Sequence, residues 1–338
     1  NIALPFRKIS GSLRFRPSSV STAGIKGFVG ESPFELKGTL SDKESQANLD
    51  MKINSSDLRK LNFIGPGWSL AGSAPLNINM KGRLPEVNFT GNLDFKTLVI
   101  IKDAWVRKPA GVALNFEFSG FKNAEGFTVD DAYLVSDASR ISTRAQLKED
   151  GKFFASMNLP PKGIPTSDLT WMVDPALELQ PGGRIEGDVI LKKDKNQDSE
   201  VDANFSLNHV SLRLPRARKR TEGITGALQF KGKTLQINVE RSRTGSSIIS
   251  ADIFITDFSH PRFKAGFDCE FLDITDFTDQ SGQTPVMSWI DWIRANSVIQ
   301  FLNQSRGNIS LKVAKKKTAY RTFSDFRSDF EGANGMLT

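Results

Sequence analysis

The stretch Leu76-Asn77-Ile78-Asn79-Met80 has an apolar residue at every second position and an asparagine between them. Successive side chains of a β-strand point to opposite faces of its sheet, so this pattern predicts a strand with one apolar and one polar face. The same alternation recurs along the chain, for example in Leu49-Asp50-Met51-Lys52-Ile53 and in Leu235-Gln236-Ile237-Asn238-Val239. Gly, Asn, Asp, Pro and Ser separate these stretches at spacings that suit antiparallel strands joined by turns. The sequence therefore predicts an all-β, mostly antiparallel protein.

Landmarks that recur in one order indicate an internal repeat. A Gly-x-Leu-x-Phe strand begins at Gly11 and again at Gly226. A second landmark is the motif Ser-Asp-Leu, which ends at Leu58 and again at Leu169, and its variant Thr-Asp-Phe, which ends at Phe277. The two intervals between these end points are nearly equal. We therefore predict three β-groove repeats, of which the third is expected to be incomplete. Their predicted bounds are 1–110, 111–222 and 223–338.

The third repeat carries an insertion. The step from the Asp-Leu landmark to the glycine that opens the next strand is equally long in the first two repeats, but the step from Phe277 to Gly307 is about twice that length. The added residues include Trp289, Ile290, Ile293, Ile299 and Leu302, whose spacing fits one face of a helix better than it fits a strand. We predict one inserted helix near 285–303, which either covers part of the sheet or serves as a lid or membrane-facing element.

Residue composition argues against several classes of function. The lone Cys269 excludes a disulfide framework and a cysteine-rich zinc site, and His209 and His260 leave little for a histidine-based metal or catalytic cluster. The chain contains no phosphate-binding loop and no Gly-x-Ser-x-Gly motif. Asp130 and Asp131 are adjacent, so on a strand they would point to opposite faces, a poor geometry for paired acid–base chemistry. We expect a protein that is not an enzyme and that uses no cofactor or metal.

Phenylalanine is abundant in this chain, with 25 Phe beside 2 Tyr. Both suit strands, but the tyrosine hydroxyl wants a polar partner, so the choice of Phe favours faces that meet neither water nor hydrogen-bonding groups. Helical patterns are too few to cover such faces. The sheet must then close on itself around a core or form a trough. We favour the trough, an elongated, bent and twisted repeating β-groove, and keep the closed apolar core as the alternative.

The candidate residues of the groove are the apolar members of the alternating strands. Alternation looks the same in a closed core, so the pattern alone does not decide between the two. The candidates are Leu13, Phe15, Phe34, Leu36, Leu49, Met51, Ile53, Leu76, Ile78, Met80, Phe89, Leu93, Phe95, Leu114, Phe116, Phe118, Phe205, Leu207, Leu228, Phe230, Ile237, Phe267 and Phe271.

The densest basic stretch runs from residue 213 to residue 220. It is interpreted as a solvated loop, as a contact for anionic lipid headgroups or an acidic partner, or as a nucleic-acid site. Nucleic-acid binding would normally add exposed aromatic residues or a helix for the major groove, and neither is predicted nearby, so we expect no nucleic acid. The candidates for headgroup or partner contact are Arg213, Arg216, Arg218, Lys219 and Arg220.

The strand pattern resembles that of the AsmA-like family of Gram-negative envelope proteins. The likeness lies in the Gly-x-Leu-x-Phe strands, in Leu36-Lys37-Gly38-Thr39-Leu40 and in Leu272-Asp273-Ile274-Thr275-Asp276-Phe277, and it extends over nearly the whole chain. It implies a repeating β-groove in the periplasm, in a parent protein anchored in the inner membrane by an N-terminal helix that is absent here.

The resemblance also implies what the groove does. Phospholipid acyl chains would be its ligands, the membranes at the ends of the parent protein and envelope proteins its partners, and phospholipid transport toward the outer membrane its role, supporting the integrity of that membrane. The alternative is a structural or adhesive β-repeat scaffold with a closed apolar core.

Overall fold

The fold was analysed in a computed structural model, and strands dominate it. Among the described residues, strands account for 76% and helices for 5%, and most of these strands belong to one large, mostly antiparallel open sheet. The all-β prediction is therefore confirmed, while the predicted helix near 285–303 lies outside the described residues. The structure describes residues 4–60, 68–83, 85–102, 106–137, 139–168, 180–194, 199–213, 219–256, 262–277, 306–317, 322–333 and 336–337.

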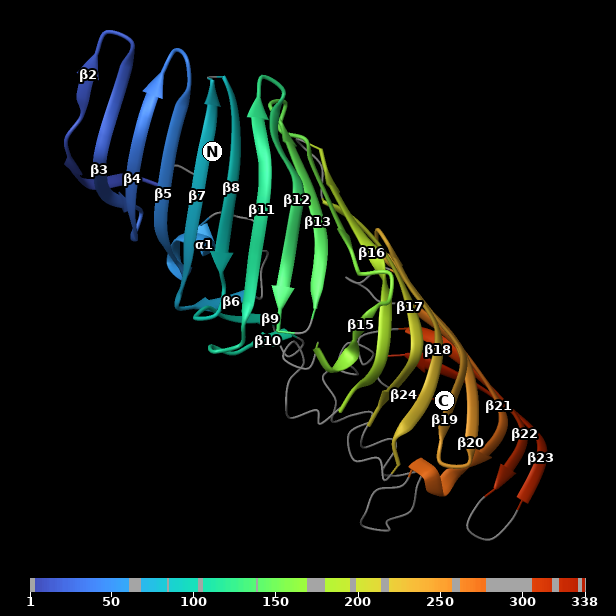
Figure 1. The fold of residues 1–338 in the computed structure, drawn as a ribbon. Coiled ribbons are helices and arrows are strands. Elements are labelled where there is room, and N and C mark those ends of the chain that lie inside the picture. The colour runs from blue at the N-terminus through green and yellow to red at the C-terminus, as the bar shows by residue number, and fades with distance from the viewer. Residues whose placement is uncertain are drawn as a thin grey trace. The chain divides into compact units, whose positions relative to one another are not determined.

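The chain divides into two compact units, of which the first contains β1 to β14. Its strands begin with β1 (Phe6–Gly11) and β2 (Arg14–Arg16), which both pair with β3 (Ser19–Val29). The following strands of the large sheet pair antiparallel in chain order (Figure 1). They are β4 (Ser32–Ser41), β5 (Ser45–Asn54), β7 (Ser73–Arg83), β8 (Glu86–Asp94), β11 (Leu114–Asn123), β12 (Gly126–Ser136), β13 (Arg140–Lys148) and β14 (Phe153–Asn158).

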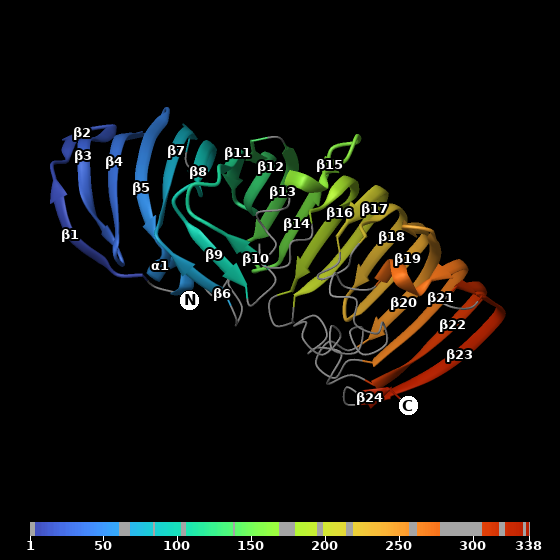
Figure 2. The same ribbon diagram turned by 90° about the horizontal axis from the view of Figure 1, so that it is seen from below.

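Two features interrupt this ladder of strands. Helix α1 (Ser55–Lys60) follows β5, and a separate three-stranded sheet consists of β6 (Trp68–Ala71), β9 (Val99–Lys102) and β10 (Val106–Lys108). Since β6 leads into β7, and β9 and β10 join β8 to β11, the small sheet lies where β7 and β11 begin and β8 ends, part-way along the series of strands (Figure 2). The sequence predicted neither feature, because segments of three to six residues are too short to display a period.

The second unit contains β15, most of β16 and the strands from β17 to β24. Strand β15 pairs with β16, and β17 to β21 pair antiparallel in chain order. The bounds are β15 (Ile164–Pro165), β16 (Gly182–Lys193), β17 (Glu200–Leu212), β18 (Thr221–Lys231), β19 (Thr234–Thr244), β20 (Ser247–Thr256), β21 (Arg262–Asp273), the 3₁₀ turn η3 (Ile274–Phe277), β22 (Arg306–Lys317), β23 (Thr322–Ala333) and β24 (Met336–Leu337).

Strands β21 and β22 pair in parallel, unlike their neighbours. Parallel neighbours need a connection of a dozen residues or more, because the chain must return to the start of the first strand. The long step of the third repeat, from Phe277 to Gly307, supplies that connection. The insertion therefore has a topological consequence that the sequence pattern did not predict.

β-Bulges recur at matching places in the chain. They lie between Thr22 and Ile25 of β3, between Val129 and Ala132 of β12, and between Val239 and Ser242 of β19. Each one gives the strand one residue more than the next strand has over the same stretch, and each strand ends in a hairpin turn. The interval from one bulge to the next is close to the interval between the sequence landmarks, although the predicted repeat boundaries themselves stay a prediction.

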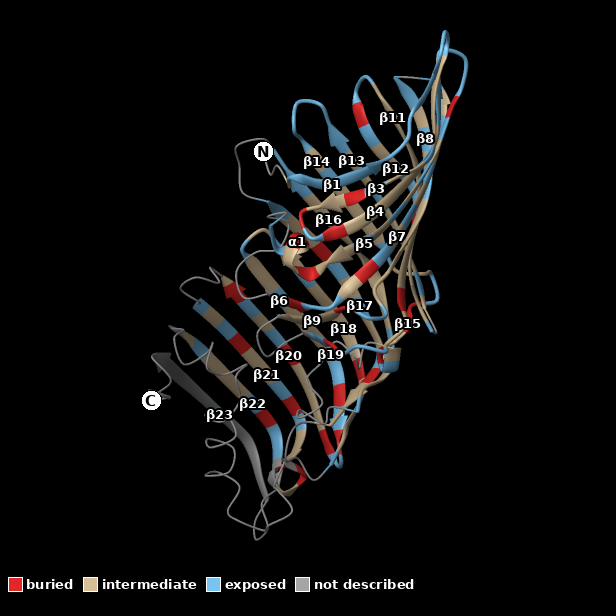
Figure 3. Ribbon diagram, turned by 90° about the vertical axis from the view of Figure 1, so that its left-hand side faces the viewer, coloured by how far each residue is buried: buried red, intermediate tan, exposed pale blue. Residues whose placement is uncertain are grey.

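Few side chains of the described strands are buried. Figure 3 colours most strands as intermediate or exposed, with buried residues confined to short patches. The buried apolar side chains are Ala, Leu, Ile, Val and Cys, and no phenylalanine of the described residues is among them. Phenylalanine is among the residues most often buried in closed cores. The aromatic rings of the described sheet thus keep part of their surface accessible.

Candidate functional site

Apolar residues of the first unit lie in unbroken rows across neighbouring strands. Residues directly opposite one another in an antiparallel pair lie on the same face of the sheet, so successive opposite pairs trace one row. One row crosses from β4 to β13, six strand-to-strand steps or about 29 Å. It consists of Phe34, Met51, Leu76, Leu93, Phe116, Leu134 and Ile141.

Two further rows follow on one side of this row and on the same face, one beyond the other, because residues two apart on a strand point the same way. Most of these side chains are half-buried, and in the described part of the chain the elements that contact these strands most are their neighbours in the sheet. One row is Leu36, Leu49, Ile78, Gly91, Phe118 and Ala132, and the other is Ala47, Met80, Phe89, Gly120, Val129 and Ala145.

The opposite face of the first unit is polar. Its central row is Glu35, Asp50, Asn77, Asn92, Glu117 and Tyr133. The Arg140 guanidinium forms an ion pair with Glu117, with Nη2 3.4 Å from Oε2. Its Cζ lies 3.7 Å from the centroid of the Tyr133 ring. Exposed ion pairs of this kind contribute at most about 1 kcal/mol. This face is therefore a solvated surface, and the sheet separates it from the apolar one.

The second unit has the same division of faces. Its apolar rows cross from β17 to β22 and include residues of the parallel pair β21–β22. The central row is Phe205, Leu228, Ile237, Ile253, Ala265 and Ile309, flanked by Ala203, Phe230, Leu235, Ile255 and Phe263 on one side and by Leu207, Gly226, Val239, Ala251, Phe267 and Leu311 on the other.

Phenylalanine rings on these faces pack over glycines of the next strand. Phe118 is directly opposite Gly91, and a Cβ on Gly91 would lie 2.3 Å from the Cζ of Phe118. Phe89 is opposite Gly120, where the corresponding distance is 2.9 Å. Glycine has no Cβ, so each ring can lie against the backbone. At these positions the phenylalanine rings are packed onto the sheet and present a surface without hydroxyl groups.

Most of the predicted groove residues belong to these rows. Their role in binding stays a prediction, but the structure places them on one face of each unit's sheet. Leu13 and Phe15 are exposed, at 49% and 71%, Leu114 is buried, and the others are half-buried. Outside the rows lie Leu13, Phe15, Ile53, Phe95, Leu114 and Phe271.

Sequence reasoning missed Val129 and Leu134, which belong to the apolar rows of β12. The bulge at Asp130 and Asp131 shifts the alternation, so that Val129 and Ala132 both lie on the apolar face although they are three residues apart. Asp130 and Asp131 are both exposed at this bulge, and the expectation that their side chains point to opposite faces stays a prediction. Two consecutive acidic residues between stretches of opposite phase are the signal that could have revealed the bulge.

The basic stretch is only partly described, since Arg216 and Arg218 lie outside the described residues. The ammonium group of Lys219 lies 2.5 Å from a carboxylate oxygen of Asp276. Arg220 donates from Nη2 to the backbone carbonyl of Gln180 at 2.8 Å. Both side chains therefore make contacts inside the second unit, and a role of the stretch in headgroup or partner contact stays a prediction.

Two of the Asp landmarks are buried carboxylates that hold hairpin turns. Asp57 is 1% exposed, and its Oδ2 accepts hydrogen bonds from the backbone N–H of Glu31 at 2.8 Å and from the Ser32 hydroxyl at 2.6 Å. Ser32 in turn accepts a hydrogen bond from the backbone N–H of Asn54 at 2.9 Å. The turn between β3 and β4 is thereby tied to the end of β5. We call the group formed by Ser32, Asn54 and Asp57 the first aspartate clasp.

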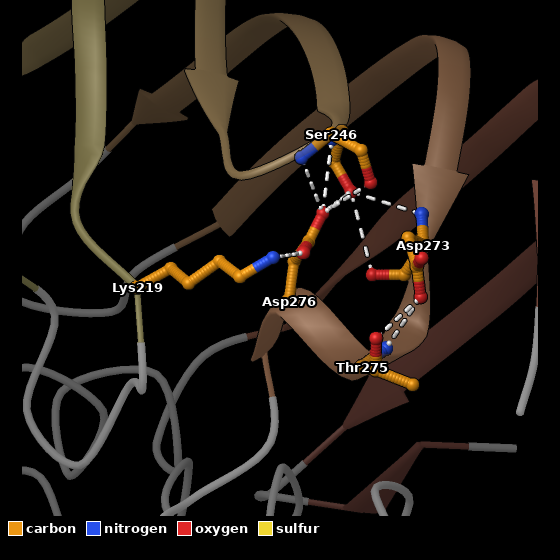
Figure 4. A network of polar contacts seen from close by, with 6 residues as sticks. Lys219, Ser246, Asp273, Thr275 and Asp276 are labelled. Atoms are coloured by element: carbon orange, nitrogen blue, oxygen red, sulfur yellow. Dashed lines mark hydrogen bonds and ion pairs between the residues drawn. The ribbon is translucent and has the colours of Figure 1, made fainter.

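The second aspartate clasp, formed by Ser247, Asp273 and Asp276, repeats this arrangement (Figure 4). Asp276 accepts hydrogen bonds from the backbone N–H groups of Ser246 and Ser247 at 2.9 and 3.0 Å and from the Ser247 hydroxyl at 2.9 Å. Ser247 accepts one from the backbone N–H of Asp273 at 2.9 Å. The turn between β19 and β20 is thus tied to the end of β21.

Glycine is required where each clasp meets its turn. Gly30 and Gly245 have φ values of +64° and +58°, and a Cβ there would lie 2.3 and 2.4 Å from the Asp57 and Asp276 carboxylates. Both the backbone conformation and the close approach therefore favour glycine. Asp168, the landmark of the predicted second repeat, is half-buried.

The clasp carboxylates are held in the ionised form. Burial raises the pKa of Asp57 and Asp276, but hydrogen bonds from serine hydroxyls, backbone N–H groups and a lysine outweigh it, so each pKa lies below its ordinary value. The lysines are Lys60, 3.4 Å from Asp57, and Lys219, beside Asp276. Donors of the chain itself occupy these carboxylates, so the clasps are structural and not ligand sites.

Two other titratable side chains, Lys108 and Cys269, are also buried. The Lys108 ammonium donates to the carbonyl oxygens of Phe95 and Leu98 at 2.7 and 3.0 Å, and burial lowers its pKa. Cys269 is 1% exposed on the apolar face of β21, and burial raises its pKa to about 11. At neutral pH the thiol is therefore protonated and a poor nucleophile.

Comparison with protein-family models, with curated protein sequences and with solved structures finds no match for this chain. The resemblance to the AsmA-like family thus rests on the strand motifs of the sequence alone. Within the described ranges, no helix is long and apolar enough to cross a membrane. Among the same residues, no three His, Cys, Asp or Glu side chains gather in a way that could hold a metal ion.

Proposed function

We propose that this chain binds the acyl chains of phospholipids along the apolar faces of its sheet and moves them without chemical change. The observation that carries the proposal is the set of continuous, half-buried apolar rows in each unit. Each buried CH₂ group contributes about 0.8 kcal/mol, so a 16-carbon chain gains up to about 12 kcal/mol, an upper limit.

Rows of similar residues also suit movement. Neighbouring positions in a row, such as Met51, Leu76 and Leu93, offer an acyl chain similar apolar surroundings. An acyl chain that moves from one position to the next therefore stays buried to a similar extent, and its free energy changes little. The headgroup stays in water, because the rows offer it few hydrogen-bonding groups.

The proposed setting is the periplasm. There the parent protein, anchored in the inner membrane, would carry phospholipid toward the outer membrane and so support the integrity of that membrane. Support for this part of the proposal comes from the resemblance to the AsmA-like family, together with the open, mostly antiparallel sheet.

The binding proposal is tested with delipidated protein and a phosphatidylethanolamine that carries a fluorescent acyl chain. Phe118→Asp places a charge in the centre of an apolar row, and Thr90→Asp places the same charge on the polar face, opposite Asn79 and Ser119. We expect Phe118→Asp to reduce lipid uptake by about tenfold or more and Thr90→Asp to leave it unchanged. Circular dichroism verifies that both variants fold. Equal uptake by the two variants, or none by the native protein, would contradict acyl binding on this face.

One observation favours the alternative of a closed scaffold. On the apolar face of the second unit, Ala265, Cys269 and Val313 are only 5%, 1% and 2% exposed, so part of that face is covered. A scaffold would contain no lipid after purification and would take up none. Extraction of the purified protein followed by mass spectrometry separates the two functions, since bound phospholipid favours the acyl-binding face.

A further inference from the structure

Strands β1 and β2 form an edge of the large sheet in the first unit. Both pair with β3 on one side, and no described strand pairs with their other side (Figure 2). The outward N–H and C=O groups of an edge strand can pair with an added strand, and such pairing is a common mode of peptide recognition. The edge therefore offers the backbone half of a docking site.

Large apolar side chains at this edge are exposed. Phe6 and Phe15 are 66% and 71% exposed, whereas Phe34, two strands into the sheet, is half-buried. Phe6 is opposite Val29, and its ring packs edge-on against the Phe34 ring, with the ring centroids 6.0 Å apart. Phe15 is opposite Val20. Both rings therefore belong to the apolar face. A ring inside the sheet has a strand on each side, but these two have one. Their exposure is what a missing neighbouring strand would leave.

The polar side chains of the same edge are basic. Arg7, Lys8, Arg14 and Arg16 are exposed, and no acidic residue occurs between Pro5 and Ser18. A second copy that paired through the same edge would bring these cations together, and like charges on adjacent strands are destabilising. Acidic residues on the added strand would instead be stabilised.

We propose that the edge formed by β1 and β2 docks an extended segment of a partner protein in which apolar and acidic residues alternate. The segment adds to the sheet as a strand. Its apolar residues cover Phe6 and Phe15 and extend the apolar face, and its acidic residues lie beside Arg14 and Arg16. The proposal is independent of lipid binding.

The test uses the fluorescein-labelled peptide Glu-Val-Glu-Phe-Glu-Val-Glu-Val and a counterpart with Lys in place of each Glu. Fluorescence anisotropy with the whole chain measures binding. We expect the acidic peptide to bind at least about tenfold more tightly than the basic one. A version of the acidic peptide with two central prolines, which cannot pair as a strand, is expected not to bind.

Variants place the binding at this edge. Arg14→Glu with Arg16→Glu is expected to reverse the preference between the two peptides, whereas the matched reversal Lys52→Glu with Lys81→Glu, on the polar face of β5 and β7, leaves it unchanged. Phe15→Ser is expected to weaken binding of the acidic peptide, which should still bind more tightly than the basic peptide. Equal binding of both peptides, binding of the proline version, or no binding at all overturns the proposal. In the last case the basic residues only protect the edge from aggregation.

Discussion

At the scale of single residues, Asp57 and Asp276 hold the conformation of whole turns. Each carboxylate replaces the water that backbone N–H groups of a turn would otherwise bind, and each is buried to 1% exposure or less. Removing an acceptor of this kind leaves buried donors without partners, which costs more than the hydrogen bonds themselves contribute. The turns should therefore depend on these two side chains more than on the surface ion pairs nearby.

We expect Asp276→Asn to loosen the turn between β19 and β20, because the asparagine NH₂ would face a donor in either orientation, the backbone N–H groups of the turn or the Lys219 ammonium group, and a neutral amide oxygen accepts hydrogen bonds less strongly than a carboxylate. A cost of about 1–3 kcal/mol corresponds to about fivefold to 150-fold faster exchange of the Ser246 and Ser247 amide hydrogens. Hydrogen exchange followed by mass spectrometry measures the exchange rates of these amide hydrogens. Asp268→Asn, on the exposed polar face of β21, is the matched control and should leave the exchange unchanged.

The pH dependence of this effect follows from the lowered pKa of Asp276. A carboxyl group whose pKa is lower in the folded state stabilises that state fully above its unfolded pKa of about 3.9, and the contribution is lost as the pH falls through the folded pKa. The difference between the native protein and Asp276→Asn should therefore be constant from about pH 7 to pH 5 and decrease below about pH 4. An unchanged difference at pH 2.5 would mean that the ionised form is not what stabilises the turn.

At the scale of elements, the pairing of phenylalanine with glycine decides how strands pack. Gly91→Ala would place a Cβ 2.3 Å from the Phe118 ring and 2.8 Å from the Asn77 carbonyl oxygen. We expect the substitution to destabilise the first unit by about 1–3 kcal/mol, as overpacking does. Phe118→Leu in the same chain should recover part of the loss, since the shorter side chain vacates the space above Gly91.

Urea denaturation measures both Gly91 variants. Gly266→Ala is the control, because its Cβ would meet only the Ser310 hydroxyl at 3.4 Å. If Gly91→Ala unfolds at the same urea concentration as the native protein, the ring is not held against the backbone at this position.

The elements differ in how well the sequence predicted them. Strands such as β5 and β7 were predictable because alternation over ten or eleven residues is a strong local signal. The Asp-Leu landmarks were visible in the sequence, but their role was not, because the hydrogen bonds of Asp57 join residues that are 25 and 26 positions apart. The bulge at Asp130 left a trace in the sequence, the break in alternation, but which residues pair around it depends on β11 and β13.

At the scale of the whole molecule, both units repeat one design, an apolar face of rows and a polar face of charges. Alternation predicted which residues share the apolar face, and the described open sheet leaves many of them partly accessible. Alternation could not predict accessibility, because that depends on what packs over the face and not on the period of the strand. A property that reports the shape of the binding surface is therefore the most informative one to measure.

The length of the acyl chain provides such a property. If ligands lie along open rows, each added CH₂ is buried in the same way and contributes up to about 0.8 kcal/mol, so affinity should rise by up to about fourfold per methylene. Displacement of a fluorescent fatty acid by decanoate, dodecanoate, tetradecanoate and hexadecanoate, each below its micelle concentration, measures the trend. Phe118→Asp should flatten it, because the charge interrupts a row. A sharp optimum at one chain length would instead indicate a closed pocket of fixed size, since a chain that is too long must leave methylenes in water or strain the walls.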